Sequence, residues 1–290
     1  MYSNRYDQII GLWTKKSYIL LKKLGAGGIG EIYLVQDASG TLLALKLSKD
    51  VVSITKEYRF LCRFQDKYFV PRVYDLDDFV KQGETYHFFT MEYIKGCNLK
   101  CALADKSIEV KTKLQLMCVV TDIIRQINEA GLIYTDLKHE NVMVDGEKQL
   151  IRLIDFGSLT EVGNTVKEFT PMYDPLSWGK GKRVADKKYQ TFVLGILLVS
   201  LMLNRSLDPN REKLQGIKYQ LRKKKIPQAV AQIVLRCIEG QMRDCSLLYE
   251  EISCAAAGLT RGDKLKRILN LLIAVLGICL LMMVFAFIAK

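Results

Sequence analysis

The stretch GLIYTDLKHEN, residues 131–141, places an aspartate, a lysine and an asparagine directly after an apolar run. Asp136 and Asn141 have the spacing D-x-x-x-x-N, and Lys138 stands two residues after Asp136. Further along, the stretch LIDFGS sets Asp155 at the end of a second apolar, strand-like run. Phosphoryl transfer uses such a set, because the protein's main tasks are to position the reactants and to neutralise charge.

Each residue of these two stretches suits one of those tasks. Asp136 can accept or orient the hydroxyl proton of an incoming alcohol, while Lys138 can balance charge on the transferring phosphoryl group. Asn141 and Asp155 offer oxygen ligands, which Mg²⁺ prefers. Any single one of them could equally be a solvated loop residue, so the hypothesis depends on further motifs in the right order.

A glycine-rich turn near the N-terminus is the first of those motifs. Gly25, Gly27 and Gly30 form G-x-G-x-x-G, which is also common in ordinary hairpin turns. A dinucleotide-binding fold would open a helix after the last glycine, whereas here the strand-like EIYLVQ of residues 31–36 follows. The pattern is therefore typical of a hairpin that can cover phosphates with its backbone N–H groups, and a purely structural turn is the open alternative.

The strand LLALKL carries the next motif. Alternation puts its leucines on one face and Ala44 and Lys46 on the other, where the small side chain leaves room for a flat ring. Strand lysines are usually solvated, so a partner is needed. Glu57, on a predicted helix, is the only glutamate between Lys46 and Glu84. An ion pair with Glu57 would orient Lys46 toward phosphate oxygens.

The pattern along the chain predicts strands first and helices later. Three strands are expected within 17–48, a short helix around KEYRFLCRF, and two more strands near VPRVYDL and YHFFTMEYI. After Gly96 apolar residues recur at helical spacing, and Gly131 is a typical residue to follow a helix end. The run of residues 192–203 is apolar on every side but too short to span a bilayer, which predicts a buried helix.

Taken together, the motifs resemble those of the protein kinases, specifically the bacterial Ser/Thr kinases of the eukaryotic-like (Hanks) type, over about residues 18–257. The resemblance implies an α+β bilobal fold with a β-rich N-lobe over 18–94 and a helical C-lobe over 95–258. It also implies ATP and Mg²⁺ as cofactors. The chain is most similar to small members of the family that carry one C-terminal membrane span.

The resemblance assigns roles residue by residue. The catalytic residues would be Asp136, Lys138, Lys46, Glu57 and Thr170, and the metal ligands Asn141 and Asp155. Met91 would be the gatekeeper before a hinge whose backbone holds adenine. The ATP-binding residues would be Leu24, Gly25, Ala26, Gly27, Gly28, Gly30, Ile32, Ala44, Lys46, Glu92, Ile94 and Met143. Lys138 and Thr170 match the Ser/Thr kinase pattern, which implies serine and threonine hydroxyls of proteins as acceptors.

Several positions depart from the family pattern. The His-Arg-Asp triplet reads Tyr134-Thr135-Asp136, so the arginine that clamps a phosphorylated activation segment is absent and a non-RD kinase is expected. The ring of Tyr134 could fill the space under Phe156. The Ala-Pro-Glu motif reads 174–176 as Asp-Pro-Leu, which removes a glutamate that Arg243 would pair with. Gln190 replaces an aspartate that holds the catalytic loop, and it can still accept hydrogen bonds.

The C-terminal end has a different composition. Residues 268–289 carry no charge, and at 1.5 Å per residue they would span roughly 33 Å, enough for a bilayer core. The segment 259–267 before them is basic, with Arg261, Lys264 and Lys266, so the positive-inside rule predicts a cytoplasmic kinase domain on a single-pass anchor in the cell membrane. Residues 1–17 form an N-terminal extension without the apolar run of a signal peptide.

Composition bounds the remaining possibilities. With 49% apolar and 26% charged residues the chain is globular, and eight cysteines without a C-x-x-C pair beside two histidines make a thiolate or imidazole metal site improbable. The net charge is +12, and the basic side chains could bind anionic lipid, nucleic acid or an acidic substrate. The alternative is that they are ordinary solvated surface residues. Autophosphorylation and self-association are also open. A scaffolding pseudokinase and a small-molecule phosphotransferase are the alternative functions.

Overall fold

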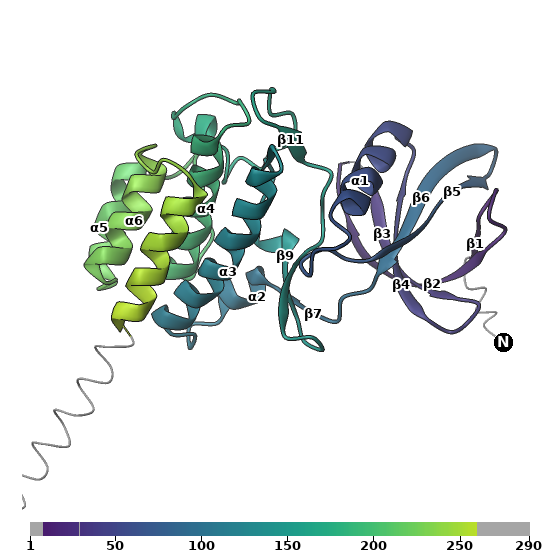
Figure 1. The fold of residues 1–290 in the computed structure, drawn as a ribbon, viewed down its shortest axis with the longest axis horizontal. Coiled ribbons are helices and arrows are strands. Elements are labelled where there is room, and N and C mark those ends of the chain that lie inside the picture. The colour runs from purple at the N-terminus through teal and green to yellow at the C-terminus, as the bar shows by residue number, and fades with distance from the viewer. Residues whose placement is uncertain (1–7, 29, 260–290) are drawn as a thin grey trace, which may run out of the picture.

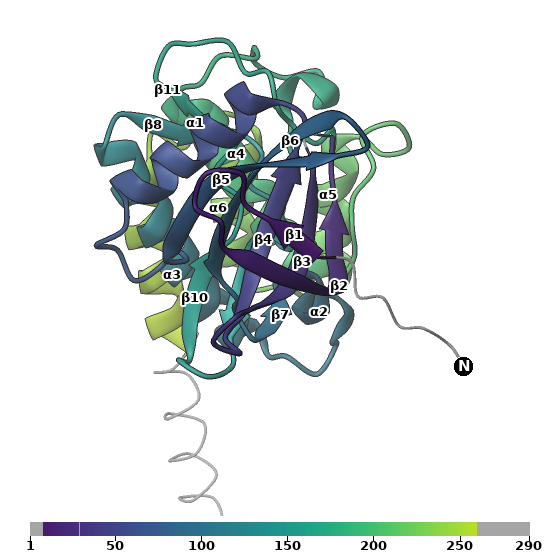
Figure 2. The ribbon, with the colours of Figure 1, turned by 90° about the vertical axis from the view of Figure 1, so that its right-hand side faces the viewer.

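The computed structural model describes residues 8–28 and 30–259, which form two lobes (Figure 1). The N-lobe, purple to blue in the figure, is a six-stranded antiparallel sheet in the order β1-β2-β3-β4-β6-β5. Figure 2 looks onto this lobe and shows α1 (Val51–Arg63) beside the sheet. The strands are β1 (Gln8–Ile10), β2 (Ser17–Ala26), β3 (Glu31–Asp37), β4 (Leu42–Ser48), β5 (Val73–Lys81) and β6 (Glu84–Glu92).

The alternation in β4 separates two apolar clusters, as the sequence predicts. Leu43 and Leu45 belong to a small cluster on one face of the sheet, with Val35 and Phe88. Ala44, on the other face, joins the main core that continues into the C-lobe. The strand therefore presents Lys46 to the side where the two lobes meet.

The N-terminal segment closes the sheet. β1 pairs with β2 at one edge, and the turn after β1 reaches β5 at the other edge, where the Leu12 N–H donates to the Asp78 carbonyl at 2.8 Å. The buried Asp77 carboxylate accepts the backbone N–H groups of Trp13 and Thr14 at 2.9 and 2.8 Å. Strand β1, which falls within the residues 1–17 expected to form an N-terminal extension, thus pairs into the N-lobe sheet.

The C-lobe, teal to yellow in Figure 1, is helical. Gly131 has φ 81° just after the second of its helices, which fits the helix end expected there, and Gly240 has φ 73° after the fifth. Residues 245–259 are also helical. The preceding helices of this lobe are α2 (Leu99–Ala104), α3 (Val110–Glu129), α4 (Lys187–Leu203), α5 (Leu214–Lys223) and α6 (Gln228–Ile238).

Helix α4 is the centre of this lobe. It is buried along nearly its whole length, as its all-round apolar sequence predicts. A Cβ at Gly195 would lie 2.5 Å from the Cβ of Cys237, so the glycine allows α4 and α6 to pack closely. Within residues 8–28 and 30–259 no helix is long and apolar enough to cross a membrane. The predicted span 268–289 lies outside the described residues.

Short strands fill the region between the lobes. β7 (Gly96–Asn98), β9 (Val142–Asp145) and β10 (Leu150–Leu153) form one small sheet, and β8 (Leu132–Tyr134) pairs with β11 (Leu159–Glu161). The turn from β8 to β9 contains a 3-10 segment, His139–Asn141. The loop after β8 meets the loop after β10, where the Asp136 N–H donates to the Ser158 hydroxyl at 3.2 Å. The loop after β10 in turn reaches the N-lobe, with Asp155 Oδ1 3.4 Å from Lys46 Nζ.

Candidate active site

The loop after β8 holds Asp136 in a fixed geometry. Lys138 Nζ lies 2.6 Å from Asp136 Oδ2, and the Thr170 hydroxyl donates to Asp136 Oδ1 at 2.7 Å. Asn141 Nδ2 donates to the Asp136 carbonyl at 3.0 Å, which closes the loop and turns the amide oxygen of Asn141 away from this contact. Lys138, Thr170 and Asn141, which the sequence predicted to act together with Asp136, therefore all contact this residue.

Lys46 and Glu57 form the ion pair that the sequence predicts, with 2.5 Å between Nζ and Oε2. Both are buried. Burial alone would lower the pKa of Lys46, but the charges of Glu57 and Asp155 outweigh it and raise that pKa. Burial raises the pKa of Glu57 to about 7, against the opposing charge of Lys46. Lys46 is thus held as a cation where the N-lobe meets Asp155.

Asp155 lies on the opposite side of the same cation. Its Oδ1 is 3.4 Å from Lys46 Nζ and accepts the Gly157 N–H at 3.2 Å. Burial opposes ionisation of the Asp155 carboxyl, but Lys46 and the Gly157 N–H outweigh that effect and lower its pKa. The side chain keeps 32% of its surface exposed, so its second oxygen can reach a ligand.

The donor set fits Mg²⁺ held partly by phosphate. Among the described residues no three His, Cys, Asp or Glu side chains stand close enough to enclose a metal ion by themselves. Asp155 and Asn141 supply one carboxylate and one amide oxygen. Mg²⁺ is usually bound by one or two such protein groups together with substrate phosphates and water, so the two side chains suffice.

The glycine-rich turn leaves space for a ligand. A Cβ at Gly25, Gly27 or Gly28 would meet no atom within 4 Å, and none of these glycines has a positive φ. Packing and backbone strain therefore do not require glycine there, which favours the phosphate-covering interpretation over a structural turn. Gly30 differs, because a Cβ would lie 2.3 Å from the Leu47 carbonyl oxygen.

The predicted adenine site is only partly assembled by contacts in the structure. Ile32 and Ala44 belong to the main core together with Met91, the expected gatekeeper, which faces Ala44 across the β4–β6 pair. Met143 lies on β9 and pairs with Asn98 of β7, just beyond the hinge. Leu24 is exposed at the rim. The sandwich of these side chains around an adenine ring stays a prediction.

A buried network behind the hinge was not foreseen from the sequence. Arg152, 3% exposed, pairs with the Glu92 carboxylate at 2.6 Å and the Asp145 carboxylate at 3.3 Å, and donates to the Val70 carbonyl at 2.8 Å. Although burial alone would raise it, hydrogen bonds from Arg152 and Lys148 lower the pKa of Glu92 to about 2. The hinge is thus tied to β9, β10 and the α1–β5 loop through one guanidinium.

The positions that depart from the kinase pattern have local replacements. The Tyr134 ring packs edge-on against Phe156 with 6.1 Å between centroids, as expected, and its hydroxyl donates to the Asp155 carbonyl. Thr135, at the position of the missing arginine, has its hydroxyl 2.7 Å from the Ser158 carbonyl and 3.1 Å from that of Glu168. We call residues 155–176 the activation segment. Its beginning, at Ser158, and its later part, at Glu168, both contact Thr135.

Glu168 is a further carboxylate near the site that the motifs did not indicate. It comes from the activation segment and is half-buried. Burial raises its pKa, and the charge of Lys56 opposes that shift. Only its place two residues before Thr170 could have drawn attention to it.

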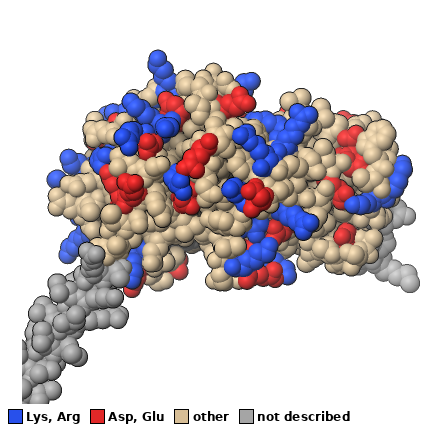
Figure 3. Space-filling model, viewed as in Figure 1, with Lys and Arg blue, Asp and Glu red and all other residues tan. Residues whose placement is uncertain are grey.

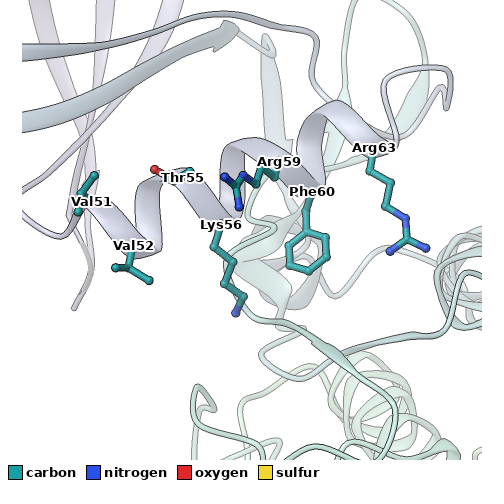
Figure 4. Close-up of a pocket in the computed structure, with 7 residues that line it drawn as sticks. All are labelled: Val51, Val52, Thr55, Lys56, Arg59, Phe60 and Arg63. Carbon is teal, nitrogen blue, oxygen red and sulfur yellow. The ribbon is translucent and has the colours of Figure 1, made fainter.

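Hollows in the surface lie beside the site as well as away from it. A cavity of about 290 Å³ is lined by Lys138 and Thr170, the two side chains that contact the Asp136 carboxylate, and also by Lys100, Glu140 and Met172. A larger hollow of about 540 Å³ follows one side of α1 (Figure 4) and contains none of the predicted site residues. Its lining is Val51, Val52, Thr55, Lys56, Arg59, Phe60 and Arg63.

Comparisons with known proteins agree with this geometry. The model of the protein kinase domain matches residues 18–256. The serine/threonine-protein kinase YabT of Bacillus subtilis is 35% identical over 197 residues, 66% of this chain and 57% of YabT. The serine/threonine-protein kinase PrkC of the same organism is 24% identical over 214 residues, 68% of this chain and 32% of PrkC. The chain thus spans little more than half of YabT and about a third of PrkC.

Proposed function

The chain belongs to the protein kinase family, and from this membership we propose that it transfers the γ-phosphate of ATP to serine and threonine hydroxyls of proteins at a membrane. The observation that carries the proposal is the arrangement of Asp136, whose two carboxylate oxygens are held by Lys138 and Thr170 while the Lys46–Glu57 pair is intact. These are the residues that position the reactants and neutralise their charge.

The residues divide the work by their places in the cleft. Asp136 orients the acceptor hydroxyl and takes its proton, and Lys138, in contact with Asp136, neutralises charge on the transferring group. Lys46, oriented by Glu57, holds nucleotide phosphates from the N-lobe side. Asn141 and Asp155 would hold Mg²⁺, which would neutralise charge on the nucleotide phosphates. Protein substrates that offer serine or threonine would enter over the cavity beside Thr170.

We also propose that the kinase is of the non-RD type. Thr135 joins the carbonyls of Ser158 and Glu168 directly, so a phosphate on the activation segment is not needed to bring these two parts of it together. The Glu–Arg pair of the family is not formed among the described residues, because Leu176 stands at the glutamate position and the exposed Arg243 pairs with Asp244. Autophosphorylation on this segment would then accompany activity without being required for it.

A pseudokinase that binds nucleotide as a membrane scaffold is the alternative. It is motivated by the altered support residues, and the intact contacts of Lys46, Asp136 and Asp155 speak against it. A phosphotransferase for small molecules would share the same acidic core. The relatives named serine/threonine-protein kinases favour a protein acceptor.

The deciding experiment measures Mg²⁺-dependent transfer of labelled γ-phosphate by the full chain in detergent micelles. Transfer to serine or threonine should be present in the wild type and lost in Asp136→Asn and Lys46→Ala. Asp66→Asn, which changes an exposed aspartate 3.7 Å from its neighbour Lys67, serves as the matched control. Nucleotide binding without any transfer, with lipid or DNA added, would instead support the scaffold.

The membrane anchor is part of the proposal. It rests on the uncharged run 268–289 and on the basic residues Arg261, Lys264, Lys266 and Arg267 before it. We expect the full chain to stay with membranes at alkaline pH and high salt, and a chain ending at 262 to be released. Release of both forms by salt alone would contradict an inserted helix.

Part of the positive charge is proposed to face an anionic inner leaflet. The charge runs are LRKKK at 221–225 and GKGKR at 179–183. On the face shown in Figure 3, however, Lys and Arg side chains are interspersed with Asp and Glu over both lobes. Salt-sensitive binding of the chain ending at 262 to anionic vesicles would support the proposal. Binding to DNA but not to vesicles would favour a nucleic-acid partner.

A further inference from the structure

The segment between the 3-10 helix Pro175–Trp178 and α4 lies across the activation segment. We name residues 179–186 the strap. Residues 163–164 exchange two hydrogen bonds with Ala185, at 2.9 and 2.8 Å, and the Val166 N–H donates to the Arg183 carbonyl at 3.0 Å. The strap therefore runs antiparallel to the activation segment over residues 183–185, and Arg183 lies at one end of this contact.

The Arg183 side chain holds two residues of the activation segment at once. Its Nε and one terminal nitrogen donate to Asp174 Oδ2 at 3.1 and 2.9 Å. Its guanidinium lies 3.9 Å from the centre of the Phe169 ring, within cation–π distance. Asp174 is fully buried, whereas the Arg183 side chain is 36% exposed.

The two residues that Arg183 holds enclose Thr170. Phe169 directly precedes Thr170, and the Asp174 N–H donates to the Thr170 carbonyl at 3.2 Å. Thr170 in turn donates its hydroxyl to Asp136. A shift of either residue would move the hydroxyl that fixes one oxygen of the Asp136 carboxylate.

We propose that Arg183 is a positioning residue for phosphoryl transfer, acting through Phe169 and Asp174 on the Thr170–Asp136 contact. This inference rests on the proposed function, since it concerns the same site. Arg183 replaces the support that the missing Ala-Pro-Glu glutamate would give, because Asp174 and not Leu176 carries the carboxylate here. Leu176 is 45% exposed, and Arg243 pairs only with Asp244 among the described contacts.

Arginine suits this position better than lysine. A planar guanidinium can donate two hydrogen bonds to one carboxylate while stacking on an aromatic ring, and an ammonium group cannot do both. Lys182, its neighbour on the strap, is exposed and carries the same charge. We therefore assign the positioning role to the planar guanidinium of Arg183, and not to the positive charge that Arg183 shares with Lys182.

The first test compares steady-state transfer by the full chain in micelles for the wild type, Arg183→Gln and Arg183→Lys. We expect kcat/KM for a protein acceptor to fall on the order of 10-fold to 100-fold in both variants, while ATP affinity changes little, because the nucleotide contacts are on other elements. Arg243→Gln and Lys182→Gln should behave as the wild type. Wild-type kcat/KM in Arg183→Gln would overturn the proposal.

A second readout does not depend on activity. Amide hydrogen exchange over residues 166–176 should be faster in Arg183→Gln than in the wild type, with exchange in the core of α4 unchanged. Equal loss of protection in both regions, or failure of both variants to fold, would make Arg183 a general stability residue and overturn the proposal. If the wild type transferred no phosphate but Arg183→Gln still showed faster exchange over residues 166–176, only the proposed function would be contradicted.

Discussion

The side chain of Gln190 holds the backbone of Tyr134 from two sides: its Oε1 accepts the Tyr134 N–H at 2.8 Å, and its Nε2 donates to the Tyr134 carbonyl at 3.4 Å. Gln190 is fully buried in α4. An amide can satisfy a donor and an acceptor together without a charge, whereas an ionised carboxylate can only accept. The catalytic loop therefore keeps its attachment to α4 although the family's aspartate is absent.

Replacing Gln190 by alanine should detach the catalytic loop from α4. The buried Tyr134 N–H would lose its partner and a cavity would form, so we expect a loss of about 2–4 kcal/mol in the free energy of unfolding. Transfer activity should fall as well. Urea unfolding measures the first effect, and Gln241→Ala, at an exposed glutamine, should change it by less than about 0.5 kcal/mol. Equal stability of the two variants would show that the contact contributes nothing.

From the buried Lys46–Glu57 pair we predict that kcat/KM for ATP falls on the acid side of its pH profile. The Glu57 carboxyl attracts Lys46 only while it is ionised, and burial raises the pKa of this carboxyl to about 7. As the pH falls through 7 the carboxyl takes up a proton, the ion pair is lost and kcat/KM for ATP should fall. This parameter reports ionisations of the free enzyme.

Glu57→Gln separates this effect from ionisation of ATP itself. The variant should be slow at all pH values, and its profile should lack the fall near pH 7. A fall that persists unchanged in Glu57→Gln would assign it to another group.

The sequence predicted the parts of the site that depend on short-range order. The strands of the N-lobe follow from alternation, and β4 could be oriented because leucines alternate with Ala44 and Lys46. Glu57 was found by elimination, and Asp136, Asn141 and Asp155 by spacing. In each case a local pattern was enough, because β-strands and tight loops fix the direction of neighbouring side chains.

Long-range partners could not be predicted in the same way. In the sequence, nothing distinguishes Arg152 from any other basic residue of a strand. Only the fold shows that Glu92, Asp145 and Val70 all contact it. The sequence pointed to Arg243 as the arginine that the missing glutamate would pair with, and for the same reason it gave no sign that Arg183 pairs with Asp174. Nothing in residues 8–17 indicated a strand that closes the N-lobe sheet, since β1 is only three residues long.

Replacing Arg152 should strongly lower the free energy of unfolding. Arg152→Met would leave the Asp145 carboxylate buried without its cation and would release the hinge at Glu92. Breaking a buried pair from one side costs about 3–5 kcal/mol, so we expect a drop of this order in the free energy of unfolding. The measurement is urea unfolding with and without nucleotide.

Lys148→Met provides the matched control, because Lys148 pairs with the same Glu92 but is 53% exposed. Exposed pairs contribute about 0–1 kcal/mol, so this variant should remain close to the wild type. Similar losses in both variants would mean that burial of Arg152 does not decide its contribution.

His139 predicts a loss of stability in weak acid. The imidazole is buried against Tyr173, with its Nδ1 in contact with the phenol oxygen, and burial lowers its pKa to about 4. The unfolded chain would protonate near pH 6.5, so the stabilisation is complete above that value and is lost as the pH falls toward 4. Between pH 7 and pH 5 the loss from this one group should be about 2 kcal/mol.

The check is urea unfolding of the wild type and His139→Gln at pH 7, 6 and 5. Other groups titrate in both proteins, so the difference between the two pH profiles isolates the imidazole. The variant should lose about 2 kcal/mol less than the wild type over this interval, because glutamine takes up no proton. Parallel profiles would mean that His139 is protonated as readily in the fold as in the unfolded chain, and that its burial beside Tyr173 does not oppose the charge.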